Sequence, residues 1–194
     1  SSQTRLSALS QPGGPTLISG GPPGLFVSGG RTMRNVQSRD IEASAGAVGA
    51  LIDGLGGTGS IWPERTWPPL RLSDGLNSGS TGGHGPIRYA VRRYQPGHLV
   101  EFEFDPRIGL TGWHRFTLEQ GPDGRVRLVH TLQARTTGVQ VLLWPLATRW
   151  LHEALLHDLL DNAERALTGE VATPSRWSWW VRRLRAVMTR RRKP

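Results

Sequence analysis

Residues 86–105 read PIRYAVRRYQPGHLVEFEFD, with apolar and charged side chains alternating on both sides of Gln95-Pro96-Gly97-His98. Pro and Gly favour a turn here, and the alternation predicts two half-buried strands, so the segment predicts an antiparallel hairpin. With Gln95 opposite His98, one face pairs apolar side chains: Tyr89 with Phe104, and Val91 with Phe102. The other face pairs opposite charges: Arg92 with Glu101, and Arg88 with Asp105. Such cross-strand charge pairs stabilise this register.

A second hairpin is predicted directly after the first. Its turn is QGPDG at 120–124, and its strands cover 112–119 and 125–135. With Glu119 opposite Arg125, the inward residues pair as follows: Leu118 with Val126, Phe116 with Leu128, and His114 with His130. The period of two along a strand puts both histidines on the apolar face even if the turn contains a bulge. The shared face follows from this period alone, whereas direct opposition also depends on the geometry of the turn.

A long helix is predicted from Pro145 to Leu167, with Gly169 as its stop. At 100° per residue its buried stripe consists of Leu156, Leu159, Leu160, Ala163 and Leu167. His152 lies inside this stripe. The opposite, solvated side is predicted to carry Asp158, Asp161 and Arg165.

The part before the hairpins is less regular. Residues 35–43 predict a polar strand, and Ser44 predicts the cap of a short helix whose apolar face includes Val48 and Ile52. Residues 62–69 predict a second short helix or a turn-rich wall, and residues 75–85 a Gly/Ser loop. This order of elements, strand, short helices, antiparallel strands and one long helix, predicts an α+β fold.

Charge divides the chain of 194 residues into unequal parts. Eight of its nine net positive charges come from residues 174–194, which contain no acid, so the body is nearly neutral. We predict a disordered Gly/Pro/Ser-rich segment at 1–34, one domain at 35–168 and a basic extension at 169–194. Met33 is a candidate start of the native chain. The chain contains no cysteine, which excludes disulfides and thiolate chemistry.

Five segments together resemble the SRPBCC, or START-like helix-grip, superfamily, which includes polyketide cyclases and lipid-transfer proteins. They are residues 83–89 (GHGPIRY), 94–97 (YQPG), 112–114 (GWH), 127–130 (RLVH) and 144–161, the last forming the start of the long helix. The resemblance covers residues 35–168. It implies a curved antiparallel sheet wrapped around a long C-terminal helix, with a largely apolar cavity between them.

His114, His130 and His152 are the candidate catalytic residues, because sheet face and helix stripe converge on one cavity in such a fold. A neutral imidazole can hydrogen-bond a ligand or move a proton near neutral pH. The alternative is that each ring satisfies a hydrogen bond in the core. No inward carboxylate orients these rings, which counts against a catalytic triad. Three imidazoles could also bind a divalent ion, but we predict neither a metal nor another cofactor.

Candidate ligand-binding residues surround these histidines. Arg149 could reach an anionic ligand group from the cavity mouth, although pairing with Glu153 is the commoner role of such an arginine. The aromatic candidates are Tyr89, Phe102, Phe104, Phe116, Trp62, Trp67 and Trp144. Each of them would serve equally well in a packed core.

The basic extension predicts an amphipathic helix. The residues expected to bind an anionic membrane are Trp177, Trp180, Arg182, Arg183, Leu184 and Arg185. The alternatives are that this helix folds back on its own domain, stays solvated, or binds nucleic acid through phosphates. We do not expect nucleic acid as the partner.

The predicted function is binding of a hydrophobic small molecule, a lipid or polyketide-like compound, in the cavity under the long helix. The alternative is an enzyme of the cyclase/dehydratase type that moves protons with the cavity histidines. A third class is an interaction protein that acts through its basic tail. The predicted location is the cytoplasm, with peripheral attachment to the inner face of the membrane through the extension.

Overall fold

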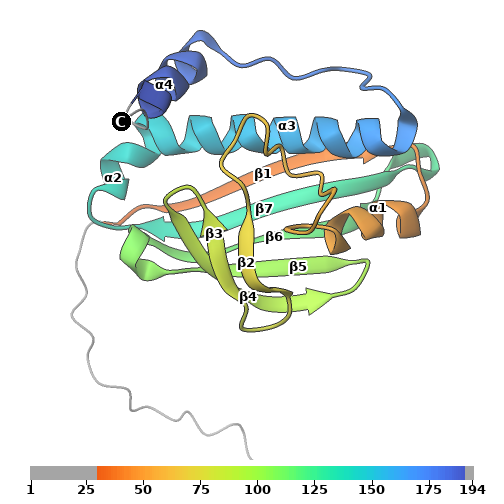
Figure 1. The fold of residues 1–194 in the computed structure, drawn as a ribbon, viewed down its shortest axis with the longest axis horizontal. Coiled ribbons are helices and arrows are strands. Elements are labelled where there is room, and N and C mark those ends of the chain that lie inside the picture. Colours follow the sequence, from red (N-terminus) through yellow and green to blue (C-terminus); the bar gives the residue numbers. More distant parts are fainter. Residues whose placement is uncertain (1–29, 191–194) are drawn as a thin grey trace, which may run out of the picture.

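The computed structural model describes residues 30–190, and most of the predicted disordered segment lies outside this range. Seven strands form one antiparallel sheet in the order β1-β7-β6-β5-β4-β3-β2, and the long helical segment runs along one side of it (Figure 1). The strands are β1 (Thr32–Ile41), β2 (Arg71–Leu76), β3 (Thr81–His84), β4 (Ile87–Gln95), β5 (Leu99–Phe104), β6 (Leu110–Gln120) and β7 (Val126–Thr136). The α-helices are α1 (Ala45–Asp53), α2 (Gln140–Leu143), α3 (Arg149–Thr168) and α4 (Trp179–Arg190).

The β4–β5 hairpin has the predicted apolar register. Tyr89 lies opposite Phe104, and Val91 lies opposite Phe102. After Val91 a bulge shifts the pairing by one residue, so that Arg93 rather than Arg92 lies opposite Glu101. Arg92 still reaches Glu101, at 3.7 Å between Nε and Oε1.

The β6–β7 hairpin has its predicted faces but a different register. Phe116 lies opposite His130, and His114 lies opposite Leu132, so the predicted direct opposition of the two histidines is wrong. The turn is as long as predicted but lies one residue further along the chain, because Gln120 pairs with Val126 and the 3-10 segment between them is centred on Asp123, whose φ is 53°. The shift is by an even number of residues, so both histidines stay on the inward face.

The structure adds two strands where the sequence predicted a loop. β3 and the last two residues of β2 fall within residues 75–85, and β3 pairs with β4. Their glycines hide the strand signal but allow close approach: a Cβ on Gly82 would lie 1.9 Å from the carbonyl oxygen of Arg71. The strand β1 begins at Thr32, three residues before the predicted start.

The short and long helices follow the predicted local signals. The hydroxyl of Ser44 accepts from the N–H of Ala47 and caps α1. The long helical segment starts at Gln140, five residues earlier than predicted, and passes Pro145 in a π-helical turn at Trp144–Thr148. Pro145 has no N–H to donate, and the wider turn accommodates it. Gly169, at φ 83°, ends α3 as expected.

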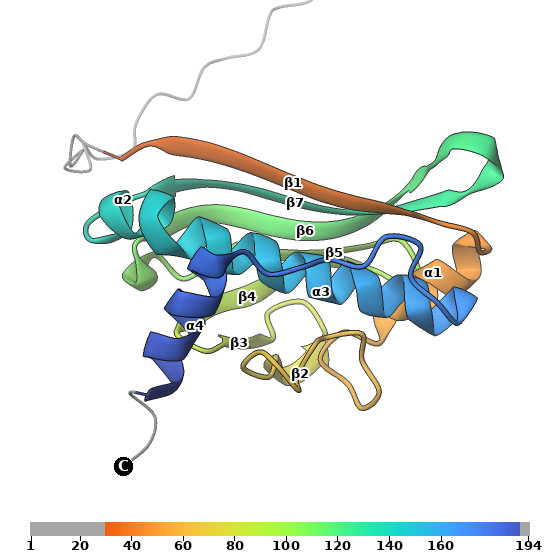
Figure 2. The ribbon, with the colours of Figure 1, turned by 90° about the horizontal axis from the view of Figure 1, so that it is seen from above.

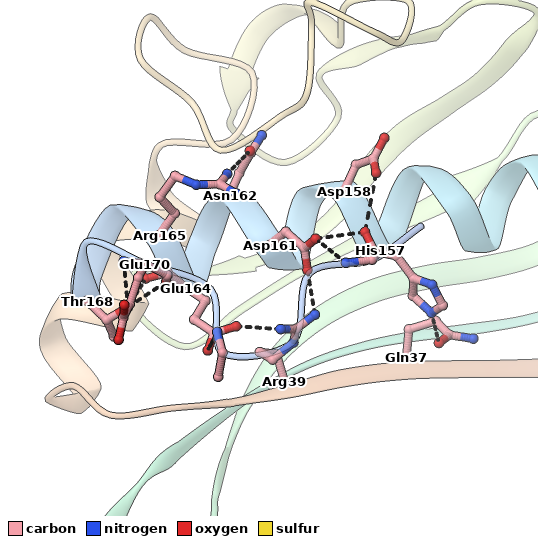
Figure 3. Close-up of polar contacts among 12 residues, drawn as sticks. Gln37, Arg39, His157, Asp158, Asp161, Asn162, Glu164, Arg165, Thr168 and Glu170 are labelled. Atoms are coloured by element: carbon pink, nitrogen blue, oxygen red, sulfur yellow. Dashed lines mark hydrogen bonds and ion pairs between the residues drawn. The ribbon is translucent and has the colours of Figure 1, made fainter. Parts of the chain in front are cut away.

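The predicted solvated side of α3 is partly covered, which corrects the sequence interpretation. Only 7% of Asp161 is exposed, because Arg39 of β1 pairs with it and with Glu164 (Figure 3). The extension after Gly169 runs back along the helix and covers Asp158 as well (Figure 2). Arg165 is exposed as predicted. Within residues 30–190, no helix combines the length and apolar character needed to span a bilayer.

Candidate functional site

A cavity of about 350 Å³ lies between the inner face of the sheet and the helical segment. Its floor comes from β5, β6 and β7, and its roof comes from α2, the π-helical turn and the first half of α3. The residues around Trp62 and the β3–β4 turn close one side. Histidine is the only titratable residue type among the described residues that line it, because no Asp, Glu, Lys, Arg or Tyr belongs to this wall.

Most of the predicted site residues meet at this cavity. Eight of them line it: His114, His130, His152, Trp62, Trp67, Trp144, Phe104 and Phe116. Tyr89 and Phe102 are buried one layer behind the wall, where both rings pack on His114 at centroid distances of 4.9 Å. The three histidines therefore lie in the wall of one cavity.

His114 and His130 contact each other diagonally across β6 and β7. Nδ1 of His114 lies 3.2 Å from Nε2 of His130, so one ring donates an N–H to the other. His152 of α3 approaches from the roof, with its ring centroid 5.2 Å from that of His130. Phe102 and Phe104 stack on the His114 ring at interplanar angles of 19° and 30°, which holds its orientation.

His84 is a cavity residue that the sequence analysis did not single out. It ends β3, and its Nδ1 lies 3.1 Å from the hydroxyl oxygen of Tyr89. The signal was present in His84-Gly85-Pro86-Ile87, where a two-residue turn puts His84 opposite Ile87. That pairing puts His84 on the same face as Tyr89, but the surrounding glycines predicted a loop instead.

All four cavity histidines are held in the neutral form. Burial lowers the pKa of His84 to about 3 and that of His152 to about 4. Burial also lowers the pKa of His114 and His130 well below the ordinary value, and the neighbouring histidines add to this effect. Since no carboxylate lines the cavity to stabilise an imidazolium, these rings serve as neutral hydrogen-bond partners at neutral pH.

Three ring nitrogens of this cluster have no hydrogen-bond partner among the described residues. They are Nε2 of His114, Nδ1 of His130 and Nδ1 of His152. In the His114–His130 pair, one ring must be the donor and the other the acceptor. Whichever tautomer is present, the two remaining nitrogens of the pair are therefore one N–H donor and one lone-pair acceptor. Leaving such buried groups unpaired costs free energy that a bound polar group would recover.

Arg149 lies outside the cavity wall. Its Nε donates to Oε1 of Glu153 at 2.9 Å, and its guanidinium lies over the ring of Trp150. The sequence analysis left this pairing open as the alternative to a ligand contact of Arg149. Among residues 30–190, no group of three or more His, Asp or Glu side chains is placed to hold a metal ion.

A larger hollow of about 1190 Å³ lies on the other side of α3, between residues 56–66 and the extension. It is lined by charged residues, but several already have partners inside the protein. Asp158 accepts from the indoles of Trp67 and Trp177, and Arg71 pairs with Glu64. Since these charges are paired, the smaller apolar cavity is the better candidate for a ligand site.

The predicted membrane-binding residues lie on α4 or, in the case of Trp177, just before it, and they divide between a side that faces the body and an outward side. Trp177 and Arg185 turn toward the body: the Trp177 indole donates to Asp158, and the Arg185 guanidinium lies 4.5 Å from the ring centre of Trp67. Leu184 is half-buried, and the Trp180 indole donates to the carbonyl oxygen of Leu146. Arg182 and Arg183 are exposed. The helix therefore folds back on its own domain.

The sheet, the long helix and the cavity between them define a helix-grip protein. No protein-family model and no curated protein matches the sequence. Solved structures do share the fold. Norcoclaurine synthase from Thalictrum flavum aligns with a TM-score of 0.55 at 12% identity, over 79% of this chain and 98% of that protein. Its complex with dopamine and hydroxybenzaldehyde aligns with a TM-score of 0.55 at 11% identity, over 74% and 91% of the two chains.

A conserved protein of unknown function from Enterococcus faecalis aligns with a TM-score of 0.50 at 14% identity, over 84% of this chain and 88% of that one. At these identities the likeness concerns the fold alone. It confirms the predicted fold class, a curved antiparallel sheet with a long C-terminal helix packed across it, and leaves the ligand to be argued from the cavity itself.

Proposed function

We propose that this protein binds a compact, uncharged and largely apolar molecule in the histidine-lined cavity. The observation that supports the proposal is a cavity of about 350 Å³ whose wall combines aromatic side chains with unpartnered imidazole nitrogens. This volume is at the lower end of the range for small-molecule sites, which are mostly apolar with a few polar groups that fix orientation.

The wall favours a neutral ligand over an anionic one. None of the described lining residues carries a charge at neutral pH, and burying an unpaired carboxylate or phosphate in such a wall would be costly. Arg149, the predicted partner of an anion, is already paired with Glu153. Of the two ligand types expected from the sequence, a polyketide-like ring compound therefore fits better than an ionised lipid.

The polar group of the ligand is best matched by a hydroxyl. The His114–His130 pair offers one donor and one acceptor at its two ends, and a hydroxyl can accept from the one or donate to the other. Norcoclaurine synthase, which shares the fold, has been solved with dopamine and hydroxybenzaldehyde bound. We infer a hydroxylated aromatic or polyketide-like ligand for this chain.

The alternative function is an enzyme of the cyclase/dehydratase type. The observation that favours it is the direct His114–His130 contact, because the pair could relay a proton. If the ligand gives a proton to the outer nitrogen of one ring while the outer nitrogen of the other ring releases one, the proton between the rings shifts and both rings stay neutral. The lowered pKa values of both rings weigh against proton abstraction from a weak acid. Hydrogen bonding to a ligand is therefore the preferred role.

The test begins with native mass spectrometry of freshly purified protein, to identify any organic molecule that accompanies it. Three probes then compare ligand chemistry by tryptophan quenching: 2-naphthol, naphthalene and 2-naphthoate. We expect 2-naphthol to bind one per chain, naphthalene more weakly, and 2-naphthoate at least about tenfold more weakly, because the wall has no cation.

Two variants and one control connect binding to the cavity. His130→Leu should weaken 2-naphthol binding about tenfold, the worth of one hydrogen bond, but should leave naphthalene binding nearly unchanged. Ala147→Trp, which fills the roof of the cavity, should abolish binding of both. The control, His98→Leu, alters an exposed turn residue and should change neither. Equal affinity for 2-naphthoate, or a bare polypeptide that binds none of the three probes, would refute the proposal.

A further inference from the structure

Exposed apolar side chains gather at one end of the molecule. Between residues 30 and 190, seven of the eight large apolar side chains that are exposed lie on α2, the π-helical turn, the start of α3 and α4. They are Val139, Leu142, Leu143, Leu146, Trp150, Trp179 and Val187. Leu142 is 67% exposed, Leu146 60% and Trp179 71%. Contiguous apolar surface of this kind marks an interaction site.

The α2 and α4 parts of this surface are joined. The Trp180 indole donates to the carbonyl oxygen of Leu146 at 2.8 Å, which connects α4 to the π-helical turn. Figure 2 shows α4 crossing the first part of α3 beside α2. Val181 is only 4% exposed, so one side of α4 packs on the body. Trp179, Arg183 and Val187 follow one another at intervals of four residues on the outward side.

The charge around this surface is positive. Arg182 and Arg183 are exposed on α4, and residues 171–194 contain no acid. Exposed Trp and Leu side chains beside arginines match the interface of a bilayer, where apolar groups enter the acyl boundary and basic groups meet anionic headgroups. We propose that the surface formed by α2, the π-helical turn and the outward side of α4 docks on an anionic lipid membrane.

This docking surface differs from the one that the sequence predicted. Trp177, Leu184 and Arg185 were expected to bind the membrane. Trp177 precedes α4 and donates to Asp158 of the body, and Leu184 and Arg185 lie on the side of α4 that faces the body. Leu142 and Leu146, which belong to a different segment of the chain, take their place. Only the fold brings the two segments together.

Docking would bring one wall of the cavity against the bilayer. Leu143 and Ala147 of the roof, and Met188 of α4, line the cavity and belong to the same segments as the docking surface. An apolar ligand could then pass between lipid and cavity at this end. The docking proposal goes beyond ligand binding, and either can fail without the other.

The test is co-sedimentation of the full chain with phosphatidylcholine vesicles, with and without phosphatidylglycerol. We expect binding only to the anionic vesicles and loss of binding at high salt. A basic residue near an anionic surface contributes about a fivefold change in partitioning, so Arg182→Gln with Arg183→Gln should weaken binding about 25-fold. Leu142→Asn with Leu146→Asn should also weaken it at least about tenfold, because the apolar contact is lost.

The matched control is Arg34→Gln with Val36→Asn, which changes an exposed arginine and an exposed apolar residue of β1. It should bind vesicles like the unmodified protein. His130→Leu, which impairs the cavity, should also bind vesicles normally, and this separates the two proposals. Circular dichroism checks that each variant is folded.

Three results would overturn the docking proposal. The first is equal binding, or none, to both kinds of vesicle. The second is a dimer in light scattering that the Leu142→Asn, Leu146→Asn variant dissociates, since it would assign the surface to a second copy. The third is binding to duplex DNA that requires Arg182 and Arg183 but not Leu142 and Leu146, because the basic residues would then bind nucleic acid and not lipid.

Discussion

At the scale of single residues, Gly49 shows how tightly α1 is seated on the sheet. A Cβ at this position would lie 2.4 Å from the carbonyl oxygen of Gly97 in the β4–β5 turn. One turn later, Asp53 accepts from the N–H of Gly97 at 2.7 Å and from the hydroxyl of Tyr94 at 2.9 Å. The helix and the turn are therefore in backbone contact, and only glycine fits at the point of contact.

We expect Gly49→Ala to lower the free energy of unfolding by about 1–3 kcal/mol, because the added methyl group must displace backbone. The matched control is Gly46→Ala in the same helix, where a Cβ has nothing within 4 Å. That change should raise the free energy of unfolding by up to about 1 kcal/mol through helix propensity. Urea denaturation measures both. Effects of the same sign in the two variants would contradict this account of the contact.

At the scale of elements, the extension is held to α3 by two carboxylates. Asp158 accepts from the indoles of Trp67 at 2.7 Å and Trp177 at 3.0 Å. Asp161 accepts from the N–H and the hydroxyl of Ser175 at 2.8 and 2.7 Å. These bonds place α4 over the start of α3, so the position of the proposed docking surface depends on them.

Asp158→Asn should loosen the extension. An amide keeps one acceptor oxygen, carries an NH2 group in place of the other and has no charge, so the bonds from the two indole N–H groups would become weaker. We expect faster amide hydrogen exchange across residues 171–190 and little change in the strands. Asp123→Asn, at an exposed position in the β6–β7 turn, serves as the control, since asparagine tolerates its positive φ. Unchanged exchange in the Asp158 variant would mean that the indole bonds do not hold the extension.

At the scale of the whole molecule, the buried histidines connect stability to pH. Their pKa values are lowered in the folded state, to about 3 for His84 and about 4 for His152, from an ordinary value of 6.5. At pH values between these folded-state pKa values and 6.5, the unfolded chain binds more protons than the folded one. Stability is therefore fully present above about pH 6.5 and decreases as the pH falls.

Thermal unfolding should detect this loss at pH values above those at which carboxylates titrate. Each neutral buried histidine contributes up to about 1.4 kcal/mol per pH unit below 6.5. We expect a clear drop in the midpoint temperature between about pH 7.5 and about pH 5, and a smaller drop for His152→Gln. His98→Gln, at an exposed position, should reproduce the drop of the unmodified protein. A midpoint independent of pH over this range would contradict burial of the neutral rings.

Local pattern predicted much of this fold, and its failures have local causes. Alternation placed Phe104, His114 and His130 on the inward face, because the period of a strand does not depend on its partner. The pairing of His114 was wrong by two residues, because the turn is centred on Asp123, in the left-handed conformation, and not on Pro122. His84 was missed because glycine-rich strands have no alternation to detect.

The sequence by itself determined which faces of the strands are apolar, where α1 is capped and where α3 ends, since each depends on neighbours within about one turn. The tertiary structure alone decided three other features. These are the space left open between sheet and helix, the neutral state of four histidines that meet there, and the covering of Asp161 by Arg39. Each of them depends on contacts between residues far apart in the chain, and such contacts exist only after the elements have packed.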